Sequence, residues 1–223
     1  MMPMLIYTIS LKKRGNSMGS SAAIFCNGEY GSLENLKKFV NLNEVFVIGV
    51  DGGCNFLIQN KVKIDFLIGD FDSIEDKNYI NEIIGIEKFD MDYSDFELAI
   101  NYCIENNFEK VYLLGCTGKR SDHFIFNLRL MEKIFKYGID VMMIDDYNLI
   151  MPFKGNKVLN REEFRFFSIV PLQENTTISI EGSKYDVKNQ KLDMFRALTL
   201  SNEWKEEKVK IFSDNIVFLH LVF

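Results

Sequence analysis

The chain has 223 residues, of which 47% are hydrophobic and 26% charged, and its formal net charge is −6. This balance is typical of a folded globular protein rather than a disordered chain, and the acidic charge argues against a general nucleic-acid-binding surface. No apolar run approaches the roughly 20 residues of a membrane span. Four cysteines without C-x-x-C spacing and only two histidines argue against a structural zinc site and favour a reducing, cytoplasmic setting.

Residues 1–17 are a candidate N-terminal extension. Their apolar stretch at 4–11 is followed by the basic residues 12–14, whereas a secretory signal places its basic residues first. Patterned sequence begins only after Met18. We therefore expect residues 1–17 to be non-essential and translation to start at Met18.

Short apolar runs alternate with helix-like segments up to about residue 146. Alternation of this kind predicts an α/β fold, in which a mostly parallel, doubly wound sheet has helices on both faces. The runs expected as strands are 22–26, 45–50, 65–68, 86–89, 111–114 and 141–144.

Segment 95–106 carries the clearest helical pattern. Its apolar residues recur at i, i+3, i+4, i+7 and i+8, and Ser94 and Glu97 have the spacing of a capping box. Ser94 is therefore predicted to be the N-cap, with Asp95 in the first turn. Further helical segments are expected at 33–40, 56–60 and 122–137.

The pattern changes after Asn148. The remaining sequence holds β-rich segments separated by turn residues and no evident helical period, which predicts a small antiparallel β-sandwich. The boundary is expected within 147–155, around Pro152 and Gly155. The expected strands are 164–172, 176–181, 209–212 and 216–223. The two expected domains are 18–147 and 148–223.

Polar clusters follow the apolar runs of the first part, at the strand ends where doubly wound sheets bind ligands. The most informative is Ile68-Gly69-Asp70-Phe71-Asp72-Ser73. Its two carboxylates stand at i and i+2, which share a face in a strand, and together they suit a hard cation such as Mg²⁺. The same Asp-x-Asp-Ser pattern also occurs in turns and helix caps.

Three further clusters have both a structural and a functional interpretation. Asp51-Gly52-Gly53 is either a plain turn or a loop that lets phosphate or ribose approach closely, and Asp95 is either a ligand or a helix-dipole partner. Thr117-Gly118-Lys119-Arg120 precedes a helix and suits an anion, although the Walker spacing is absent. His123 is either a surface residue at the helix start or part of the site. Carboxylates together with a basic loop indicate phosphoryl transfer.

These stretches resemble the thiamine pyrophosphokinase family. Val50-Asp51-Gly52-Gly53-Cys54-Asn55 is similar to the family's A-D-G-G-A-N turn, and residues 65–73 to its D-x-x-x-G-D-F-D-S block. Residues 92–99 resemble D-x-T-D-x-E-x-A, and residues 115–123 resemble G-A-T-G-G-R-x-D-H. In the last part, Gly182-Ser183-Lys184-Tyr185 and residues 200–203 resemble the G-x-K-[YW] and S-N elements. The matches follow the family order over roughly residues 22–223.

The resemblance implies a Rossmann-like catalytic domain followed by a β-sandwich domain, in a homodimer with thiamine between the subunits. It implies transfer of the pyrophosphoryl group of ATP to the hydroxyethyl oxygen of thiamine, with release of AMP. The metal and co-substrate implied are Mg²⁺ and ATP. No nucleic-acid or membrane partner is expected.

The matched positions also imply residue roles. Asp70, Asp72 and Asp95 would hold Mg²⁺ on the phosphates, and Asp122 joins them in the catalytic group. The residues expected on the nucleotide side are Asp51, Gly52, Gly53, Asn55, Ser73, Thr117, Gly118, Lys119, Arg120 and His123. Tyr185 would stack on the pyrimidine of thiamine; its structural interpretation is that of an ordinary sandwich aromatic. The residues expected to hydrogen-bond the pyrimidine edge are Thr199, Ser201 and Asn202.

Three positions depart from the family pattern, at Met91, Lys119 and Ile64. None of these departures removes a proposed metal ligand. Two alternatives remain open at this point. Pyrophosphorylation of another alcohol, such as a pterin, would keep the carboxylates without requiring Tyr185 or Ser201-Asn202. A catalytically silent thiamine or nucleotide sensor would be expected to have lost a metal ligand.

Overall fold

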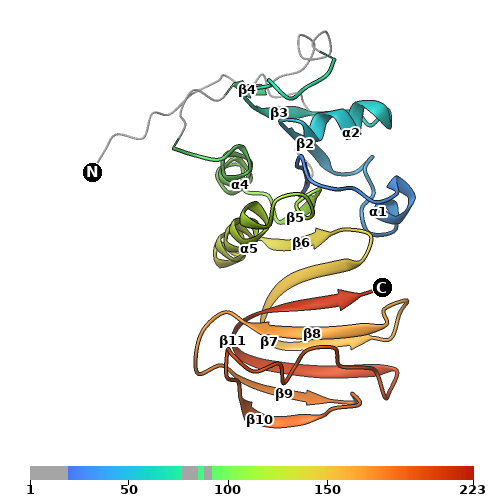
Figure 1. Ribbon diagram of the computed structural model, residues 1–223, viewed down its shortest axis with the longest axis vertical. Helices are drawn as coiled ribbons and strands as arrows, with labels where there is room; N and C mark the ends of the chain where they lie inside the picture. The colour runs from blue at the N-terminus through green and yellow to red at the C-terminus, as the bar shows by residue number, and fades with distance from the viewer. Residues whose placement is uncertain (1–19, 77–84, 88–91) are drawn as a thin grey trace.

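The computed structural model describes residues 20–76, 85–87 and 92–223 of the chain (Figure 1). The expectations for residues 1–17, Met18 and Met91 lie outside this range, as does the last part of the strand expected at 86–89. Element labels follow Figure 1.

The first half of the described chain forms a parallel sheet. Its strands are β1 (Ser21–Phe25), β2 (Phe46–Val50), β3 (Phe66–Gly69), β4 (Gly85–Glu87), β5 (Lys110–Leu114) and β6 (Asp140–Ile144). They lie in the order β6-β5-β1-β2-β3-β4, and every neighbouring pair is parallel. The carboxyl ends of β2, β3 and β5 therefore open onto one edge, as the alternating pattern predicts.

Helices cover both faces of this sheet. They are α1 (Leu33–Phe39), α2 (Gly53–Gln59), α4 (Asp95–Glu105) and α5 (Ser121–Lys136). Successive residues of a strand point to opposite faces, so Phe25 of β1 packs in one core with Leu57 of α2, whereas Ile24 packs in the other with Ile100 of α4 and Met131 of α5. Figure 1 shows α1 and α2 on one side of the strands and α4 and α5 on the other.

The predicted start of α4 is confirmed. Ser94 is its N-cap, and the Ser94 hydroxyl accepts a hydrogen bond of 3.1 Å from the backbone N–H of Glu97. Asp95 lies in the first turn, where a carboxylate is favoured by the helix dipole. The Glu97 carboxylate lies 3.4 Å from the ammonium of Lys133, which ties α4 to α5.

The second half of the chain is built of antiparallel strands. They are β7 (Asn148–Asn160), β8 (Phe166–Pro171), β9 (Thr177–Glu181), β10 (Val187–Lys191) and β11 (Lys208–Val222). β11 pairs with β7 along one side and with β9 and then β8 along the other. These strands enclose a core in which Phe167 and Trp204 meet edge to face, 4.9 Å apart.

The two halves share one sheet. β7 pairs antiparallel with β6 through Leu149 and Ile150, so the antiparallel strands continue the parallel ones without a linker. Pro152 and Gly155, expected at a boundary, lie inside β7. The pairing with β6 ends at Ile150, and an edge position of this kind tolerates a residue without an N–H.

Two further expectations about strands were wrong. The segments 209–212 and 216–223 are one strand, β11, with a shift of register between Ser213 and Val217. β10 was not expected, because most of its side chains are polar and exposed and it therefore lacks the apolar alternation that marks a half-buried strand.

Candidate active site

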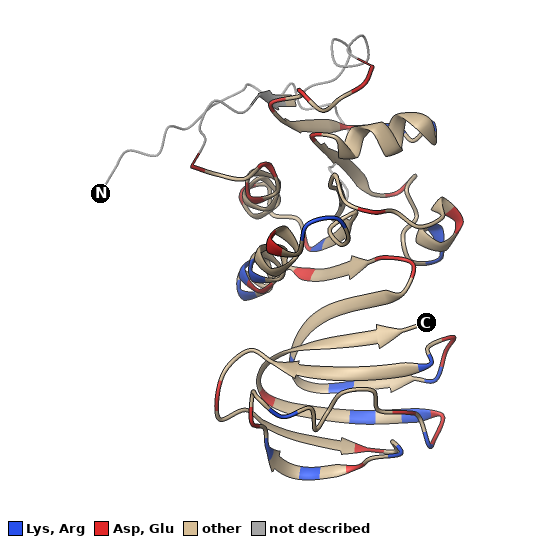
Figure 2. Cartoon of the chain, in the orientation of Figure 1, with Lys and Arg blue, Asp and Glu red and all other residues tan. Residues whose placement is uncertain are grey.

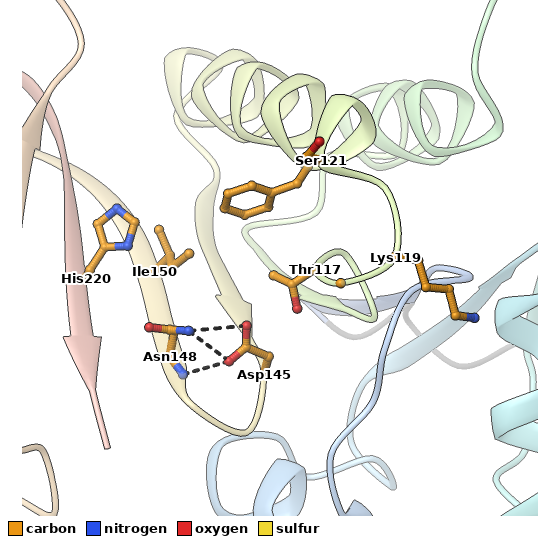
Figure 3. Close-up of a pocket in the computed structure, with 9 residues that line it drawn as sticks. Thr117, Lys119, Ser121, Asp145, Asn148, Ile150 and His220 are labelled. Carbon is orange, nitrogen blue, oxygen red and sulfur yellow. Dashed lines mark hydrogen bonds between the residues drawn. The ribbon is translucent and has the colours of Figure 1, made fainter.

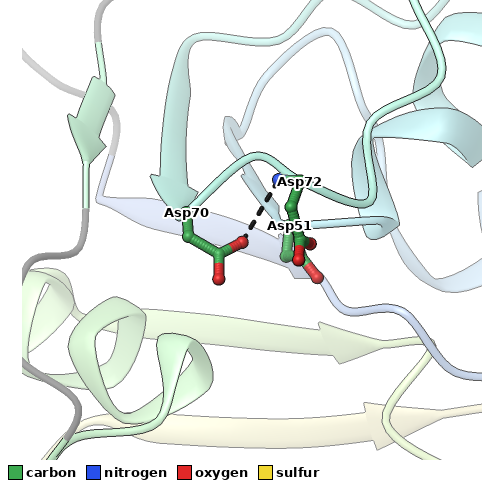
Figure 4. Close-up of side chains that lie close together, drawn as sticks. All are labelled: Asp51, Asp70 and Asp72. Atoms are coloured by element: carbon green, nitrogen blue, oxygen red, sulfur yellow. Dashed lines mark hydrogen bonds between the residues drawn. The ribbon is translucent and has the colours of Figure 1, made fainter.

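An acidic group lies at the carboxyl ends of β2 and β3. Carboxylate oxygens of Asp51, Asp70 and Asp72 all lie within 4.8 Å of one another (Figure 4). Asp51 is half-buried, whereas Asp70 and Asp72 are exposed. Three carboxylates at this spacing repel one another unless a cation is shared, and oxygen ligands of this kind are those that Mg²⁺ prefers.

Two residues of this group's loops have a backbone that favours glycine. Asp51 has a φ of 45° and Phe71 a φ of 61°, and such conformations cost of order 1–3 kcal/mol in residues with a side chain. The backbone N–H of Asp51 donates to the carbonyl of Ile68 at 2.9 Å, which fixes the β2 turn against β3. The fold therefore imposes this strain where the carboxylates meet.

The double glycine after Asp51 serves close packing. A Cβ at Gly53 would overlap the backbone carbonyl of Phe25, and one at Gly52 would overlap the side chain of Asn27. Both glycines are buried. The turn thereby brings the start of α2 against the end of β1.

Asn55 and Ser73 brace the acidic loop. The Asn55 side chain donates to the carbonyl of Ser73 at 2.9 Å and accepts from the N–H of Glu75 at 3.0 Å. The Ser73 hydroxyl donates to the Asp72 carboxylate at 2.8 Å, and the N–H of Asp72 donates to Asp70 at 3.2 Å. Both residues were expected on the nucleotide side, and in this structure they hold the metal-binding candidates in place.

The basic loop, residues 117–120, connects β5 to α5 (Figure 2). Its Thr117 carbonyl accepts from the N–H of Glu29 at 2.9 Å, and the Lys119 ammonium lies 3.5 Å from the carbonyl of Asn27. Lys119 has a φ of 49°, in the region that glycine adopts without cost. Contacts with the segment that follows β1 therefore hold the loop in place. Because β1 lies between β5 and β2 in the sheet, this segment separates the loop from the acidic group.

Arg120 and Asp122 form a two-pronged ion pair at the start of α5. The guanidinium donates from Nε to Oδ1 at 3.1 Å and from Nη2 to Oδ2 at 2.5 Å. Hydrogen bonding from Arg120 lowers the pKa of Asp122 to about 2. Both side chains are exposed, as is His123 beside them.

Asp95, expected as a third metal ligand, lies in the first turn of α4 and is not one of the three described residues whose carboxylate oxygens meet within 4.8 Å. Burial raises the pKa of Cys26 well above its usual value, and Cys116 and the charge of Asp95 raise it further. The Cys26 and Cys116 sulfurs lie 3.4 Å apart at the ends of β1 and β5. The charge of Asp95 is therefore felt at the end of β1, and Asp51 joins the two carboxylates that the sequence placed together.

A cavity of about 530 Å³ lies between the basic loop and the antiparallel strands. Figure 3 shows it bounded by the loop and the start of α5 on one side and by β7 and β11 on the other. Residues 117–119 and Ser121 line the first side, and the lining is completed by Phe124, Asp145, Asn148, Ile150 and His220.

Asn148, Ile150 and His220 were not expected in a site, because no motif marks them. Asn148 is fixed by Asp145, whose Oδ1 accepts from the Asn148 backbone N–H at 2.7 Å and from its Nδ2 at 3.2 Å. Burial lowers the pKa of His220. Its imidazole is therefore neutral at neutral pH and offers one donor and one acceptor.

In the C-terminal half the structure brings Tyr185 and Asn202 together. Tyr185 is 56% exposed, whereas Asn202 is only 3% exposed. The Asn202 side chain accepts from the backbone N–H of Tyr185 at 3.2 Å and donates to the Tyr185 carbonyl at 3.0 Å. Asn202 therefore holds the backbone that presents the Tyr185 ring.

Thr199 and Ser201 also make contacts within the fold. The Thr199 hydroxyl is buried and donates to the carbonyl of Ile169 at 2.6 Å. Ser201 has a φ of 53°, and its N–H donates to the Ser168 hydroxyl at 2.9 Å. Of the described residues that line the cavity, none belongs to the group Tyr185, Thr199, Ser201 and Asn202.

Large apolar side chains near this segment are exposed. Phe195 is 93% exposed. The neighbouring residues Met194, Leu198 and Leu200 are also exposed. We call these four residues, which all fall within residues 194–200, the apolar surface; an exposed apolar patch is a candidate interaction surface.

An acidic group and a basic loop at the carboxyl edge of a parallel sheet define the class of α/β enzymes that handle phosphate groups. Residues 37–143 match the family model described as thiamin pyrophosphokinase, catalytic domain, and residues 156–218 match the one described as thiamin pyrophosphokinase, vitamin B1 binding domain. The chain belongs to the thiamin pyrophosphokinase family.

Individual relatives agree with this assignment. The chain is 29% identical to the thiamine pyrophosphokinase of Bacillus subtilis over 164 residues, which cover 70% of this chain and 77% of the relative. It is 25% identical to thiamin pyrophosphokinase 1 of Caenorhabditis elegans, with 82% of each chain covered.

Solved structures show the same fold. The crystal structure of the Bacillus subtilis enzyme superposes with a TM-score of 0.81, at 24% identity, covering 91% of this chain and 98% of that one. Thiamin pyrophosphokinase from Candida albicans superposes with a TM-score of 0.77 at 18% identity, covering 92% and 89% of the two chains. Within the described residues, we find no helix with the length and apolar character that a membrane crossing requires.

Proposed function

We propose that the acidic group and the basic loop together carry out the reaction of the family in this chain. The enzyme transfers the pyrophosphoryl group of ATP to the hydroxyethyl oxygen of thiamine, giving thiamine diphosphate and AMP. The observation that carries the assignment of the site is the approach of Asp51, Asp70 and Asp72 to within 4.8 Å of one another, on the sheet edge that also carries the basic loop.

The carboxylates fit a divalent cation. Asp70 and Asp72 would hold Mg²⁺, with Asp51 beside them and Asp95 reaching the phosphates from α4. When bound, Mg²⁺ neutralises charge on the phosphate oxygens. Asn55 and Ser73 keep the acidic loop in place, so the ligands need little reorganisation.

The basic loop is assigned to the phosphates. Lys119 and the first N–H groups of α5 suit anionic oxygens. Arg120 offers a bidentate guanidinium for the same oxygens, and its pairing with Asp122 keeps it extended over the helix start. Asp51, Gly52, Gly53, Thr117, Gly118 and His123 complete the nucleotide side of this proposal.

The chemical step displaces AMP. The thiamine hydroxyl oxygen attacks the β-phosphorus, the bond from that phosphorus to the oxygen bridging it to the α-phosphorus breaks, and the electron pair leaves on that oxygen with AMP. The hydroxyl proton passes to a carboxylate of the acidic group or to Asp122. Positioning and charge neutralisation supply most of the rate enhancement in such transfers.

Thiamine is assigned to the C-terminal half. The exposed ring of Tyr185 suits stacking on a flat aminopyrimidine, and Ser201 offers its hydroxyl nearby. Asn202 and Thr199 are bound within the fold, so we assign them to positioning of this surface.

We further propose a homodimer in which the apolar surface is covered by a second copy. The exposure of Phe195 and its neighbours supports this arrangement. We also propose that the chain divides into two domains. Residues 18–147 would form a Rossmann-like catalytic domain, and residues 148–223 would form a β-sandwich domain. The parallel strand order and the start of β7 at Asn148 support this division.

A product assay tests the proposal. The full-length protein with MgATP and thiamine should release AMP and thiamine diphosphate in equal amounts, and omission of the divalent cation should abolish both. A pterin alcohol in place of thiamine serves as the control acceptor. Release of ADP instead of AMP, or equal turnover of the pterin alcohol, would overturn the assignment.

A further inference from the structure

We propose that Asn27 is a further catalytic residue, whose side-chain amide donates a hydrogen bond to a non-bridging oxygen on the β-phosphorus of ATP during transfer. This inference rests on the proposed function and adds a residue to its site. Asn27 lies on the segment that follows β1 and precedes residues 37–143 and 156–218, which match the family models. None of the motifs that resemble the family includes it.

The sheet places Asn27 between the two charged parts of the site. β1 pairs with β5 on one side and with β2 on the other, and neighbouring strands lie about 4.8 Å apart. The basic loop follows β5, whereas the acidic group lies at the ends of β2 and β3. A polyphosphate that contacts both parts therefore crosses the end of β1, where the chain continues into Asn27.

The backbone on both sides of Asn27 is fixed against the end of β5. The N–H of Cys26 donates to the carbonyl of Leu114 at 2.8 Å. The N–H of Gly28 donates to the carbonyl of Gly115 at 2.8 Å, and a Cβ at Gly28 would overlap that carbonyl. Because both neighbours are held, the Asn27 backbone needs little reorganisation when a substrate binds.

The Asn27 side chain lies against the turn that carries Asp51. A Cβ at Gly52 would overlap the Nδ2 and Cγ atoms of Asn27, so the amide rests on the residue next to Asp51. Asn27 is exposed, and among the described residues its side-chain amide has no hydrogen-bond partner. Asn55, by contrast, uses its amide within the acidic loop. The Asn27 amide is therefore available to a ligand.

An asparagine suits this position better than a charged residue. Its amide nitrogen carries two N–H donors and no charge, so it can bind a phosphate oxygen close to the acidic group. Aspartate has nearly the same shape, but when ionised it only accepts hydrogen bonds. A fourth carboxylate beside Asp51, Asp70 and Asp72 would also repel the phosphates.

The β-phosphorus is the atom that this donor would serve. The proposed function assigns the AMP side of ATP to the basic loop and the transferred phosphates to the acidic group, so the phosphorus under attack lies between them. In such transfers charge is spread over the equatorial oxygens of that phosphorus. A fixed donor there stabilises the transition state more than the bound substrate, so loss of Asn27 should lower kcat rather than raise KM.

Steady-state kinetics of two variants test the inference. Asn27→Ala should lower kcat and kcat/KM equally, by about 10²-fold, with KM for ATP and for thiamine unchanged. Its urea midpoint of unfolding should also stay unchanged, because the side chain is exposed. Asn27→Asp should lower kcat further, because its carboxylate repels the phosphates.

Asn43→Ala is the matched control, at an exposed asparagine between α1 and β2. It should leave kcat, both KM values and the urea midpoint unchanged. A normal kcat in Asn27→Ala, or a raised KM for ATP at normal kcat, would overturn the inference. A fall in kcat together with a lowered urea midpoint would also overturn it, since Asn27 would then only support the turn at Gly52.

NMR of the wild type keeps the inference testable if a variant does not fold. The side-chain amide resonances of Asn27 should shift when Mg²⁺ and α,β-methylene-ATP are added, because this analogue keeps all three phosphates but cannot release AMP. Those of Asn43 should stay in place, and unshifted Asn27 resonances at saturation would contradict the assignment. If the wild type releases no AMP from ATP, the proposed function fails. If it is active and the Asn27 resonances do not shift, only this role fails.

Discussion

The side chain of Asn202 makes two hydrogen bonds to the backbone of one residue, Tyr185: it accepts from the N–H at 3.2 Å and donates to the carbonyl at 3.0 Å. The same side chain also binds Ser183 and Glu203. A buried amide with both donors and its acceptor used in this way fixes the loop that carries the Tyr185 ring. Asn202 and Tyr185 are therefore expected to affect thiamine binding for different reasons.

Asn202→Ala should lower the free energy of unfolding by about 2 kcal/mol, because several buried polar groups lose their partner. It should also raise KM for thiamine and leave KM for ATP unchanged.

Tyr185→Ala should raise KM for thiamine about ten-fold through lost stacking. Its stability should change by no more than about 0.5 kcal/mol, because the side chain is largely exposed. Urea denaturation and steady-state kinetics measure both effects. Asn156→Ala, at an exposed asparagine of β7, is the control; an unchanged stability of Asn202→Ala would refute the positioning role.

Asp72→Asn and Asp51→Asn should each reduce kcat by about 10²–10³-fold, the usual effect of removing one interaction that stabilises the transition state. Both should also require more Mg²⁺ for half-maximal rate. Glu75→Gln, which removes one charge from the same exposed loop, controls for the general loss of negative charge. A magnesium titration of each variant gives the comparison, and a normal requirement in Asp51→Asn would remove Asp51 from the metal site.

Lys119→Gly distinguishes the effect of the Lys119 backbone conformation on stability from the effect of its charge on ATP binding. Because Lys119 has a φ of 49°, glycine should raise the free energy of unfolding by about 0.5–1 kcal/mol. It should nevertheless raise KM for ATP, since a cation is lost. Lys61→Gly, at a residue with a φ of 55° after α2, should give a similar gain in stability with no effect on ATP. Identical kinetics in the two variants would show that the Lys119 charge has no role.

Asp122 provides a prediction about pH. Its pKa in the folded protein is about 2, below the value of about 3.9 expected in the unfolded chain. The Arg120–Asp122 pair therefore contributes stability above about pH 4 and loses that contribution as the pH falls toward 2. NMR titration of the Asp122 carboxyl group should give a pKa near 2 in the wild type and a higher one in Arg120→Ala. An equal pKa in both proteins would show that the pair does not form in solution.

Phe195→Asp tests the second copy proposed over the apolar surface. A charge on a side chain that is 93% exposed in one chain costs little in a monomer but is strongly unfavourable in an apolar interface. The variant should sediment as a monomer where the wild type sediments as a dimer. Tyr137→Asp, at an exposed aromatic residue at the end of α5, should leave the dimer intact. A wild type that is monomeric at all concentrations would contradict the proposal.

Much of the parallel sheet could be predicted from sequence because its signals are local. Ser94 caps α4 and apolar residues recur along that helix, so its bounds follow from a few neighbouring residues. β7 has no such signal: Pro152 and Gly155 indicate a turn, and only pairing with distant β11 makes the segment a strand. β10 was missed for the same reason, since its exposed polar side chains reveal nothing of its partner.

In the candidate site, too, some features could be predicted from neighbouring residues, whereas others depend on the pairing of distant strands. Asp70 and Asp72 stand two residues apart, so their proximity can be read from the chain. The approach of Asp51 depends on the pairing of β2 with β3, and the assembly of Asn148 and His220 into one cavity depends on the pairing of β7 with β11. Sequence likewise suggested Asn202 as a ligand residue, but its burial under the Tyr185 loop is a tertiary property.

The place of β11 in the sheet has a consequence for how the protein is made. This last strand pairs with β7, β8 and β9, so these three strands cannot complete their hydrogen bonding until residues 208–222 have left the ribosome. The parallel part has all of its described strands by Ile144 and can begin to fold earlier, as N-terminal segments generally do during synthesis. A nascent chain thus exposes unpaired strand edges of the C-terminal half until residues 208–222 have emerged. Premature termination within the codons for residues 208–222 would release a product prone to aggregation.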